Sequence, residues 1–139
     1  MPKIKIEGCH QLTGTITVGG AKNSVVALIP AAILCDETVT ISNVPNITDV
    51  DDLEKILLHL NAKIDRTPGE VVINSSDIIN REITQELSKK LRASYYFMGA
   101  LLGKFNRVEM YFPGGCAIGA RPINLHLKGF ESLGATITE

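Results

Sequence analysis

Ala31-Ala32-Ile33-Leu34, near the end of a long apolar run, is the stretch from which the fold can be worked out. A similar stretch, Gly99-Ala100-Leu101-Leu102, follows at an offset of 68 residues (99 − 31). Val44-Pro45 and Phe112-Pro113 share that offset (112 − 44). Recurrence at a fixed period is typical of chains built from repeated units. The sequence therefore predicts that one structural unit occurs twice.

The periodicity of apolar residues predicts the elements of these units. Strands are expected at residues 3–7, 13–18, 38–42, 63–66, 71–74 and 107–112, and helices at residues 21–35, 46–60, 82–103 and 122–133. Pro30 predicts a kink or a shifted boundary in the first helix. Thr48 is suited to cap the second helix, and Pro122 to begin the last. This order of elements indicates an α/β or α+β fold class.

The second unit contains a glycine-rich insertion. Leu60–Ile64 matches Leu133–Ile137 at an offset of 73 residues (133 − 60), so about five residues are added before the last helix. They lie in Pro113-Gly114-Gly115-Cys116-Ala117-Ile118-Gly119-Ala120-Arg121-Pro122. The glycines allow close approach of a ligand, and Arg121 favours the thiolate and attracts anions. Cys116 is either a nucleophile or proton donor, or an ordinary thiol in a mobile loop.

Two further positions carry positive charge where a ligand could bind. Gly19-Gly20-Ala21-Lys22-Asn23-Ser24 breaks a strand and begins a helix, whose N-terminus can bind phosphate with help from Lys22. The spacing is not that of a P-loop, and an ordinary glycine turn with a solvated lysine is the alternative. Arg92 stands in the apolar stretch Leu91–Ser94. Because arginine is seldom buried alone, Arg92 pairs with a carboxylate or faces a ligand.

Composition excludes several classes of function. The net charge is −1, aromatic residues make up 5% and tryptophan is absent, so no nucleic-acid surface is indicated. Cys9, Cys35 and Cys116 lack the spacing of a zinc site or disulfide framework, and we expect no metal and no cofactor. The N-terminus lacks a signal peptide, and Val25–Cys35 is too short to span a membrane. The sequence predicts a cytoplasmic protein without membrane partners.

Four motifs occur together in order: 20–23 (GAKN), 91–94 (LRAS), 113–122 (PGGCAIGARP) and 126–129 (HLKG). With them the chain closely resembles the N-terminal part of the UDP-N-acetylglucosamine 1-carboxyvinyltransferase family, the enolpyruvyl transferases that open peptidoglycan synthesis. The resemblance covers essentially the whole chain, and the motif around Cys116 is its most specific part. Residues 90–96 are most similar to the second isoform of low-GC Gram-positive bacteria.

The resemblance implies a fold and a domain division. Members of the family have two inside-out α/β barrel domains, each built of three repeated β-α-β-α-β-β units. We therefore expect residues 1–20 to form strands of the second domain. Residues 21–139 would be the first two repeat units of a truncated N-terminal domain. The remainder of the same enzyme chain is then an expected partner.

The resemblance also implies an activity. The family transfers the enolpyruvyl group of phosphoenolpyruvate to the 3′-hydroxyl of UDP-N-acetylglucosamine and releases phosphate. Cys116 matches the loop cysteine that donates a proton to the vinyl carbon, forms a covalent phosphoenolpyruvate adduct and is alkylated by the inhibitor fosfomycin. Lys22 and Arg121 match residues that hold phosphoenolpyruvate, so these three are the expected catalytic residues. The implied substrate-binding residues are Lys22, Asn23, Arg92, Arg121, Pro122, Ile123, Asn124 and Leu125, the last four packing on the uridine.

One departure and two alternatives remain. Many members have aspartate at the position of Asn124, which still forms hydrogen bonds but has no charge. A shikimate-pathway enolpyruvyl transferase is the first alternative, although that relative does not use a loop cysteine. A nucleotide-sugar-binding module without catalysis is the second. Because the acid that deprotonates the sugar hydroxyl lies in the unmatched part of the family enzyme, we expect the chain alone to be inactive.

Overall fold

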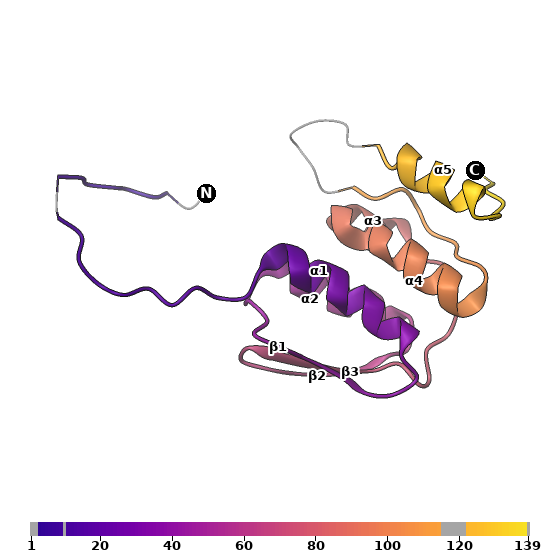
Figure 1. Ribbon diagram of the computed structural model, residues 1–139, viewed down its shortest axis with the longest axis horizontal. Coiled ribbons are helices and arrows are strands. Elements are labelled where there is room, and N and C mark those ends of the chain that lie inside the picture. The colour runs from indigo at the N-terminus through magenta and orange to yellow at the C-terminus, as the bar shows by residue number, and fades with distance from the viewer. Residues whose placement is uncertain (1–2, 10, 115–121, 139) are drawn as a thin grey trace.

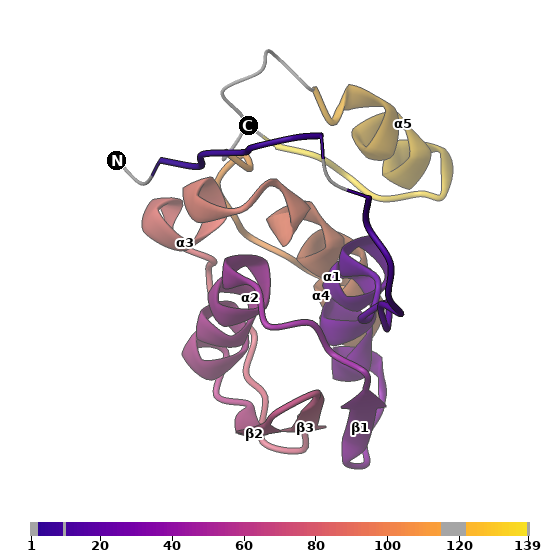
Figure 2. The same ribbon diagram turned by 90° about the vertical axis from the view of Figure 1, so that its left-hand side faces the viewer.

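A computed structural model describes residues 3–9, 11–114 and 122–138. Its elements are α1 (Lys22–Ala31), η1 (Ala32–Leu34), β1 (Val39–Ser42), α2 (Thr48–His59), β2 (Lys63–Thr67), β3 (Glu70–Asn74), α3 (Gln85–Lys90), η2 (Arg92–Tyr95), α4 (Tyr96–Phe105) and α5 (Asn124–Ser132), where η marks a 3₁₀ helix. Helices α1 and α2 lie on one face of the sheet, and α4 packs against α1 (Figures 1 and 2). Helix and strand are thus mixed, as the repeated units predict.

The sheet has the order β1-β3-β2, and both pairs are antiparallel. A tight turn at Gly69, with φ of +82°, joins β2 to β3. Val71 and Ile73 of β3 are buried, while Glu70, Val72 and Asn74, which alternate with them, are only half-buried. Successive strand residues point to opposite faces, so one face packs on the helices and the other meets solvent. The three strands predicted in this unit are confirmed.

Pro30 changes the end of the first helix as the sequence predicts. The α-helical part stops at Ala31 and continues as the 3₁₀ turn Ala32–Leu34. Proline has no backbone N–H and its ring crowds the carbonyl four residues earlier, which disfavours a regular α-helix. Pro30 itself is buried. The predicted helix over 21–35 is therefore an α-helix followed by a tighter turn.

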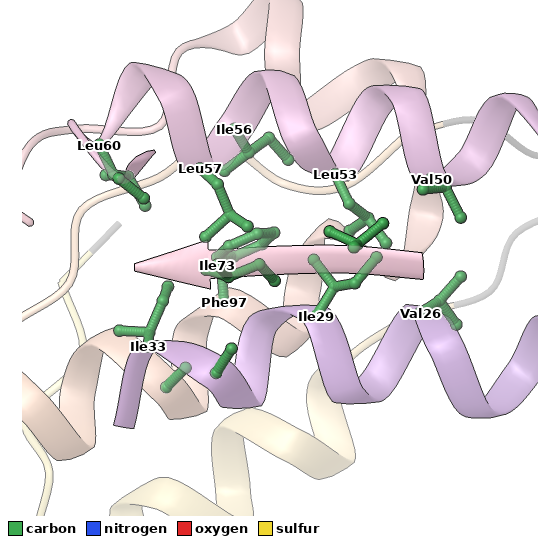
Figure 3. Packing of buried hydrophobic residues seen from close by; sticks show 14 of the residues in the cluster. Val26, Ile29, Ile33, Val50, Leu53, Ile56, Leu57, Leu60, Ile73 and Phe97 are labelled. Carbon is green, nitrogen blue, oxygen red and sulfur yellow. The ribbon is translucent and has the colours of Figure 1, made fainter. Parts of the chain in front are cut away.

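The core lies between the sheet and the helices (Figure 3). Phe97 of α4 and Ile73 of β3 have no exposed surface, and both belong to the cluster shown in Figure 3. The other labelled side chains come from α1, η1, α2 and the turn after α2: Val26, Ile29, Ile33, Val50, Leu53, Ile56, Leu57 and Leu60. Burial of apolar area is the main favourable term in folding, so these contacts fix how α1 and α2 lie on the sheet and how α4 lies on α1.

Three predictions about helices need correction. The helix expected over 82–103 is broken at Leu91, whose backbone is extended (φ −138°, ψ 126°), into α3, η2 and α4. Apolar periodicity cannot detect this break, because both halves keep their buried faces. Thr48 is the first residue of α2 rather than its cap, and Ile47 at the cap position makes no side-chain capping bond. Helix α5 begins at Asn124, so Pro122 lies outside it.

Three predicted strands are also wrong. The described residues of 3–7 and 13–18 form no strand, and Ile4 and Ile16 are each 89% exposed. In the segment 107–112 the structure has only an isolated parallel bridge between Ile83 and Met110. In the first unit, β1 and β2 both pair with β3. Among the described residues no comparable central strand lies beside 3–7, 13–18 or 107–112. The backbone N–H and C=O groups of these segments therefore lack the partners that a sheet would provide.

Candidate functional site

The lysine junction is shaped by a close backbone contact. A Cβ added at Gly20 would lie 1.7 Å from the carbonyl oxygen of Asn43, so only glycine fits. Asn43 itself has a left-handed backbone, with φ of +57°, a conformation that asparagine tolerates better than most residues. Two residues after Gly20, Lys22 begins α1. The contact therefore fixes where the chain enters the helix that carries Lys22 and Asn23.

Lys22 is held by a carboxylate from the neighbouring helix. Its Nζ lies 2.7 Å from Oδ2 of Asp49, and the side chains are 56% and 17% exposed, respectively. Asp49 lies in the first turn of α2, where the helix dipole stabilises a negative charge. Lys22 keeps more than half of its surface open, so it can still meet an anion. The spacing of Lys22 and Asp49 in the sequence does not predict this pair.

Gly20→Ala should destabilise the chain by about 1–3 kcal/mol, the usual range for forcing an extra methyl group into a packed site. The methyl would overlap the Asn43 carbonyl, and the start of α1 must move to relieve it. Gly19→Ala is the matched control because nothing lies within 4 Å of a Cβ there. Urea unfolding of both variants measures the difference. Equal midpoints for the two variants would contradict the contact.

Arg92 begins the turn η2, after the extended Leu91. Its guanidinium carbon lies 5.4 Å from the centroid of the Tyr95 ring, a distance at which a cation is attracted to an aromatic face. Nε of Arg92 is shielded from solvent and has no hydrogen-bond partner among the residues the structure describes. Within those residues no carboxylate pairs with Arg92. Of the two readings of Arg92, a ligand-facing role is the one these observations favour.

An aromatic cluster joins the Arg92 turn to helix α5. The Tyr95 ring centroid lies 4.4 Å from that of Tyr96 and 4.8 Å from that of His126. Burial raises the pKa of Tyr95 most, and Tyr96 raises it further, whereas Arg92 lowers it. His126 lies in the first turn of α5. The cluster therefore brings Arg92 close to the segment 122–125. Apart from the presence of the ring-bearing residues, nothing in the sequence predicts it.

The segment 122–125 presents mostly exposed side chains. Ile123 is 4% exposed and anchors the segment, while Leu125 is 75% exposed. Pro122 and Asn124 are also exposed. Three of the four side chains are thus open to a ligand. The expected substrate-binding residues fall into two groups, one around Lys22 and Asn23 and one around Arg92 and 122–125.

Cys116 and Arg121 lie outside the described residues, which stop at Gly114 and resume at Pro122. Gly114 is fixed by its surroundings. Its amide donates a hydrogen bond to the Ser88 carbonyl (3.2 Å), and an added Cβ would lie 2.6 Å from the Lys89 carbonyl oxygen. The glycine two residues before Cys116 is therefore held against the end of α3.

Within residues 3–9, 11–114 and 122–138 there is neither a cluster of metal-ligating side chains nor a membrane-spanning helix. No three or more His, Cys, Asp or Glu side chains gather there in a way that could hold a metal ion. No helix among the same residues is long and apolar enough to cross a membrane.

Comparison with known proteins places these residues in a family. A family model described as EPSP synthase (3-phosphoshikimate 1-carboxyvinyltransferase) matches residues 6–139. The UDP-N-acetylglucosamine 1-carboxyvinyltransferase 2 of Oceanobacillus iheyensis is 50% identical over 99% of this chain and 32% of its own length. The protein of the same name from Bacillus subtilis is 46% identical with the same coverage. The chain spans about a third of the length of these curated relatives.

A solved structure gives independent support for the fold. The crystal structure of the enolpyruvyl transferase NikO from Streptomyces tendae matches with a TM-score of 0.62 at 24% identity. The match covers 68% of this chain and 22% of that one. At this identity the likeness concerns the fold alone, and it confirms the expected fold class, part of an enolpyruvyl transferase α/β domain. Since the family model covers nearly all of the sequence, the chain belongs to the EPSP synthase family.

Proposed function

We propose that this chain is the N-terminal part of an enzyme that transfers the enolpyruvyl group of phosphoenolpyruvate to the 3′-hydroxyl of UDP-N-acetylglucosamine. The reaction releases phosphate and is the first committed step of peptidoglycan synthesis, carried out in the cytoplasm. The observation that carries the proposal is the 50% identity, over 99% of the chain, to a relative named for this reaction. The loop sequence around Cys116 agrees with it.

The chemistry assigns a proton transfer to Cys116. The thiol gives its proton to the methylene carbon of phosphoenolpyruvate while the sugar oxygen bonds to the neighbouring carbon and loses its own proton. Loss of phosphate and of a proton from the new methyl group then restores the double bond, so atoms balance. Addition of the Cys116 thiol across the double bond, with sulfur bonding to the phosphate-bearing carbon and the proton to the methylene carbon, gives the covalent adduct. A positioned general acid contributes typically about 10²–10⁴-fold to rate.

Two cations are assigned to phosphoenolpyruvate. Lys22 and Arg121 hold its phosphate and carboxylate, whose combined negative charge needs neutralising in a closed site. Lys22 is the first residue of α1 and its side chain is 56% exposed even though it pairs with Asp49, which supports this role. Free N–H groups at that helix end also favour an anion. Fosfomycin, which is also anionic, is proposed to act at the same place and to alkylate Cys116.

The nucleotide sugar is assigned to the remaining residues. Asn23 and Arg92 bind UDP-N-acetylglucosamine, and Pro122, Ile123, Asn124 and Leu125 pack on its uridine. The unpartnered Nε of Arg92 and the exposed side chains of 122–125 support this assignment. Asn124 is assigned to the uracil edge, which it recognises by hydrogen bonds. Because its side chain is neutral, it adds no charge of its own to the site.

The domain division completes the proposal. Residues 1–20 belong to the second domain and residues 21–139 to the first two repeat units of the N-terminal domain. The high exposure of Ile4 and Ile16 supports a partner for the first segment elsewhere in the remainder of the enzyme chain. In the proposed second repeat, α4 and α5 take the places that α1 and α2 have in the first. This correspondence supports two repeats.

Phosphate release tests the proposed function. The full-length enzyme should release phosphate only when phosphoenolpyruvate and UDP-N-acetylglucosamine are both present, whereas the 139-residue chain alone should release none. Replacing the sugar nucleotide by shikimate 3-phosphate is the control, because the description of the family model points to that substrate. Release with shikimate 3-phosphate would support the first alternative. Binding of the sugar nucleotide by the full-length enzyme without release would leave only a binding module.

A further inference from the structure

Ser88 and Ser94 are completely buried, and their hydroxyl groups form different bonds. Oγ of Ser94 donates to the carbonyl of Ser88 (3.1 Å), while Oγ of Ser88 donates to the carbonyl of Ile83 (3.3 Å). The Ser88 carbonyl also accepts the amide of Gly114 (3.2 Å). A single carbonyl near the end of α3 thus receives two donors from two different segments.

The location of this carbonyl explains why it needs them. The last four carbonyls of a helix have no partner within the helix, and Ser88 is one of these in α3 (Gln85–Lys90). The chain turns extended at Leu91, so the helix does not continue. The Ser94 hydroxyl and the Gly114 amide take the place of the missing helical donors. The break that separates α3 from η2 is therefore stabilised from outside the helix.

The two donors come from the two segments that carry candidate site residues. Ser94 lies two residues after Arg92 in the same turn, and its amide donates to the Leu91 carbonyl (3.1 Å). Gly114 lies two residues before Cys116 and is pressed against the backbone of Lys89. Moving either segment alters the geometry at the carbonyl that both share.

We propose that Ser94 is a positioning residue, whose buried hydroxyl, bonded to the Ser88 carbonyl, ties the turn of Arg92 to Gly114 at the start of the Cys116 loop. The functional meaning of this tie rests on the proposed function, in which Arg92 binds the sugar nucleotide and Cys116 reacts with phosphoenolpyruvate. Ser94 itself contacts no substrate. It sets the relative position of the two segments that do.

Amide hydrogen exchange in the 139-residue chain tests the tie directly. In Ser94→Ala the end of α3 loses one of the two bonds that hold the Ser88 carbonyl, so this end should open more readily. The Gly114 amide, which is bonded to the same carbonyl, should then exchange about fivefold faster, the scale of one lost buried hydrogen bond. Ser88→Ala is the matched control, since it removes an equally buried hydroxyl but leaves the Ser88 carbonyl and both its donors in place. Exchange of Gly114 in that variant should change by less than about twofold. A similar acceleration in both variants, or in neither, would overturn the proposal.

A measurement on the unaltered chain keeps the proposal testable if Ser94→Ala fails to fold. The hydroxyl proton of Ser94 should be visible by NMR as a slowly exchanging signal, and a rapidly exchanging hydroxyl would count against the bond. A titration with UDP-N-acetylglucosamine separates this inference from the proposed function. If Gly114 responds to Ser94→Ala but the full-length enzyme does not bind the sugar nucleotide, the tie stands and the proposed function fails.

Discussion

Cys116→Ala abolishes labelling of the full-length enzyme by fosfomycin; this is the largest effect that we expect on the chemistry. Labelling forms a bond from the thiolate sulfur to an epoxide carbon, and alanine has no atom that can form it. An anionic epoxide reacts selectively with a thiol where nearby cations bind it. Binding of this anion is the role assigned to Lys22 and Arg121. Intact-mass measurement with and without the inhibitor shows whether one molecule is added.

The other two cysteines provide matched controls. Cys9 and Cys35 are both exposed thiols, so a reagent that lacks selectivity should reach them. Cys9→Ala and Cys35→Ala should keep full labelling by fosfomycin, and iodoacetamide should modify both sites in the Cys116→Ala variant. Unchanged fosfomycin labelling of Cys116→Ala would refute the role given to Cys116.

Phe97→Ala should lower the free energy of unfolding by about 3–5 kcal/mol, the usual cost of truncating a buried phenylalanine. Phe97 has no exposed surface and packs in the cluster that joins α4 to α1 and β3. Domains of this size are commonly stable by about 5–15 kcal/mol. The loss is therefore a large part of the total, and urea unfolding followed by circular dichroism measures it.

Phe112→Ala makes the same chemical change at a site that is 57% exposed. Surface substitutions away from special features usually alter stability by no more than about 0.5 kcal/mol. We therefore expect an unfolding midpoint close to that of the unaltered chain. If Phe97→Ala were as mild as Phe112→Ala, the described packing of α4 against α1 would be wrong.

The sequence predicted the first repeat unit well because its signals are local. The β-branched residues at 71–73 mark a strand, and Pro30 marks a helix boundary without reference to any other segment. It did not predict the break at Leu91, because that break depends on Ser94 and Gly114 reaching the Ser88 carbonyl. The strands expected near the N-terminus were also wrong, since a strand needs a partner and periodicity does not supply one.

In the candidate site, too, the sequence identified individual residues but not the contacts between them. Lys22 and Arg92 were recognised from the residue type and its neighbours, and the structure gives each a definite setting. Lys22 contacts Asp49, and Arg92 contacts Tyr95. Sequence spacing alone does not predict either contact. One sequence feature could have suggested the pair of Lys22 and Asp49. Asp49 is a carboxylate in the first turn of the helix that follows the one beginning at Lys22. The predicted roles of the residues in 115–121 stay predictions.

The two unlike faces of the β1-β3-β2 sheet also determine where the chain can be handled in the laboratory. Thr40 and Asp65 lie opposite Val72 in the register, and both are exposed on the face that none of the described helices covers. A cysteine introduced there for a fluorophore or a solid support would leave the buried side chains of the opposite face untouched. The helices that carry Lys22, Arg92 and His126 would then stay free to meet ligands while the sheet serves as the attachment side.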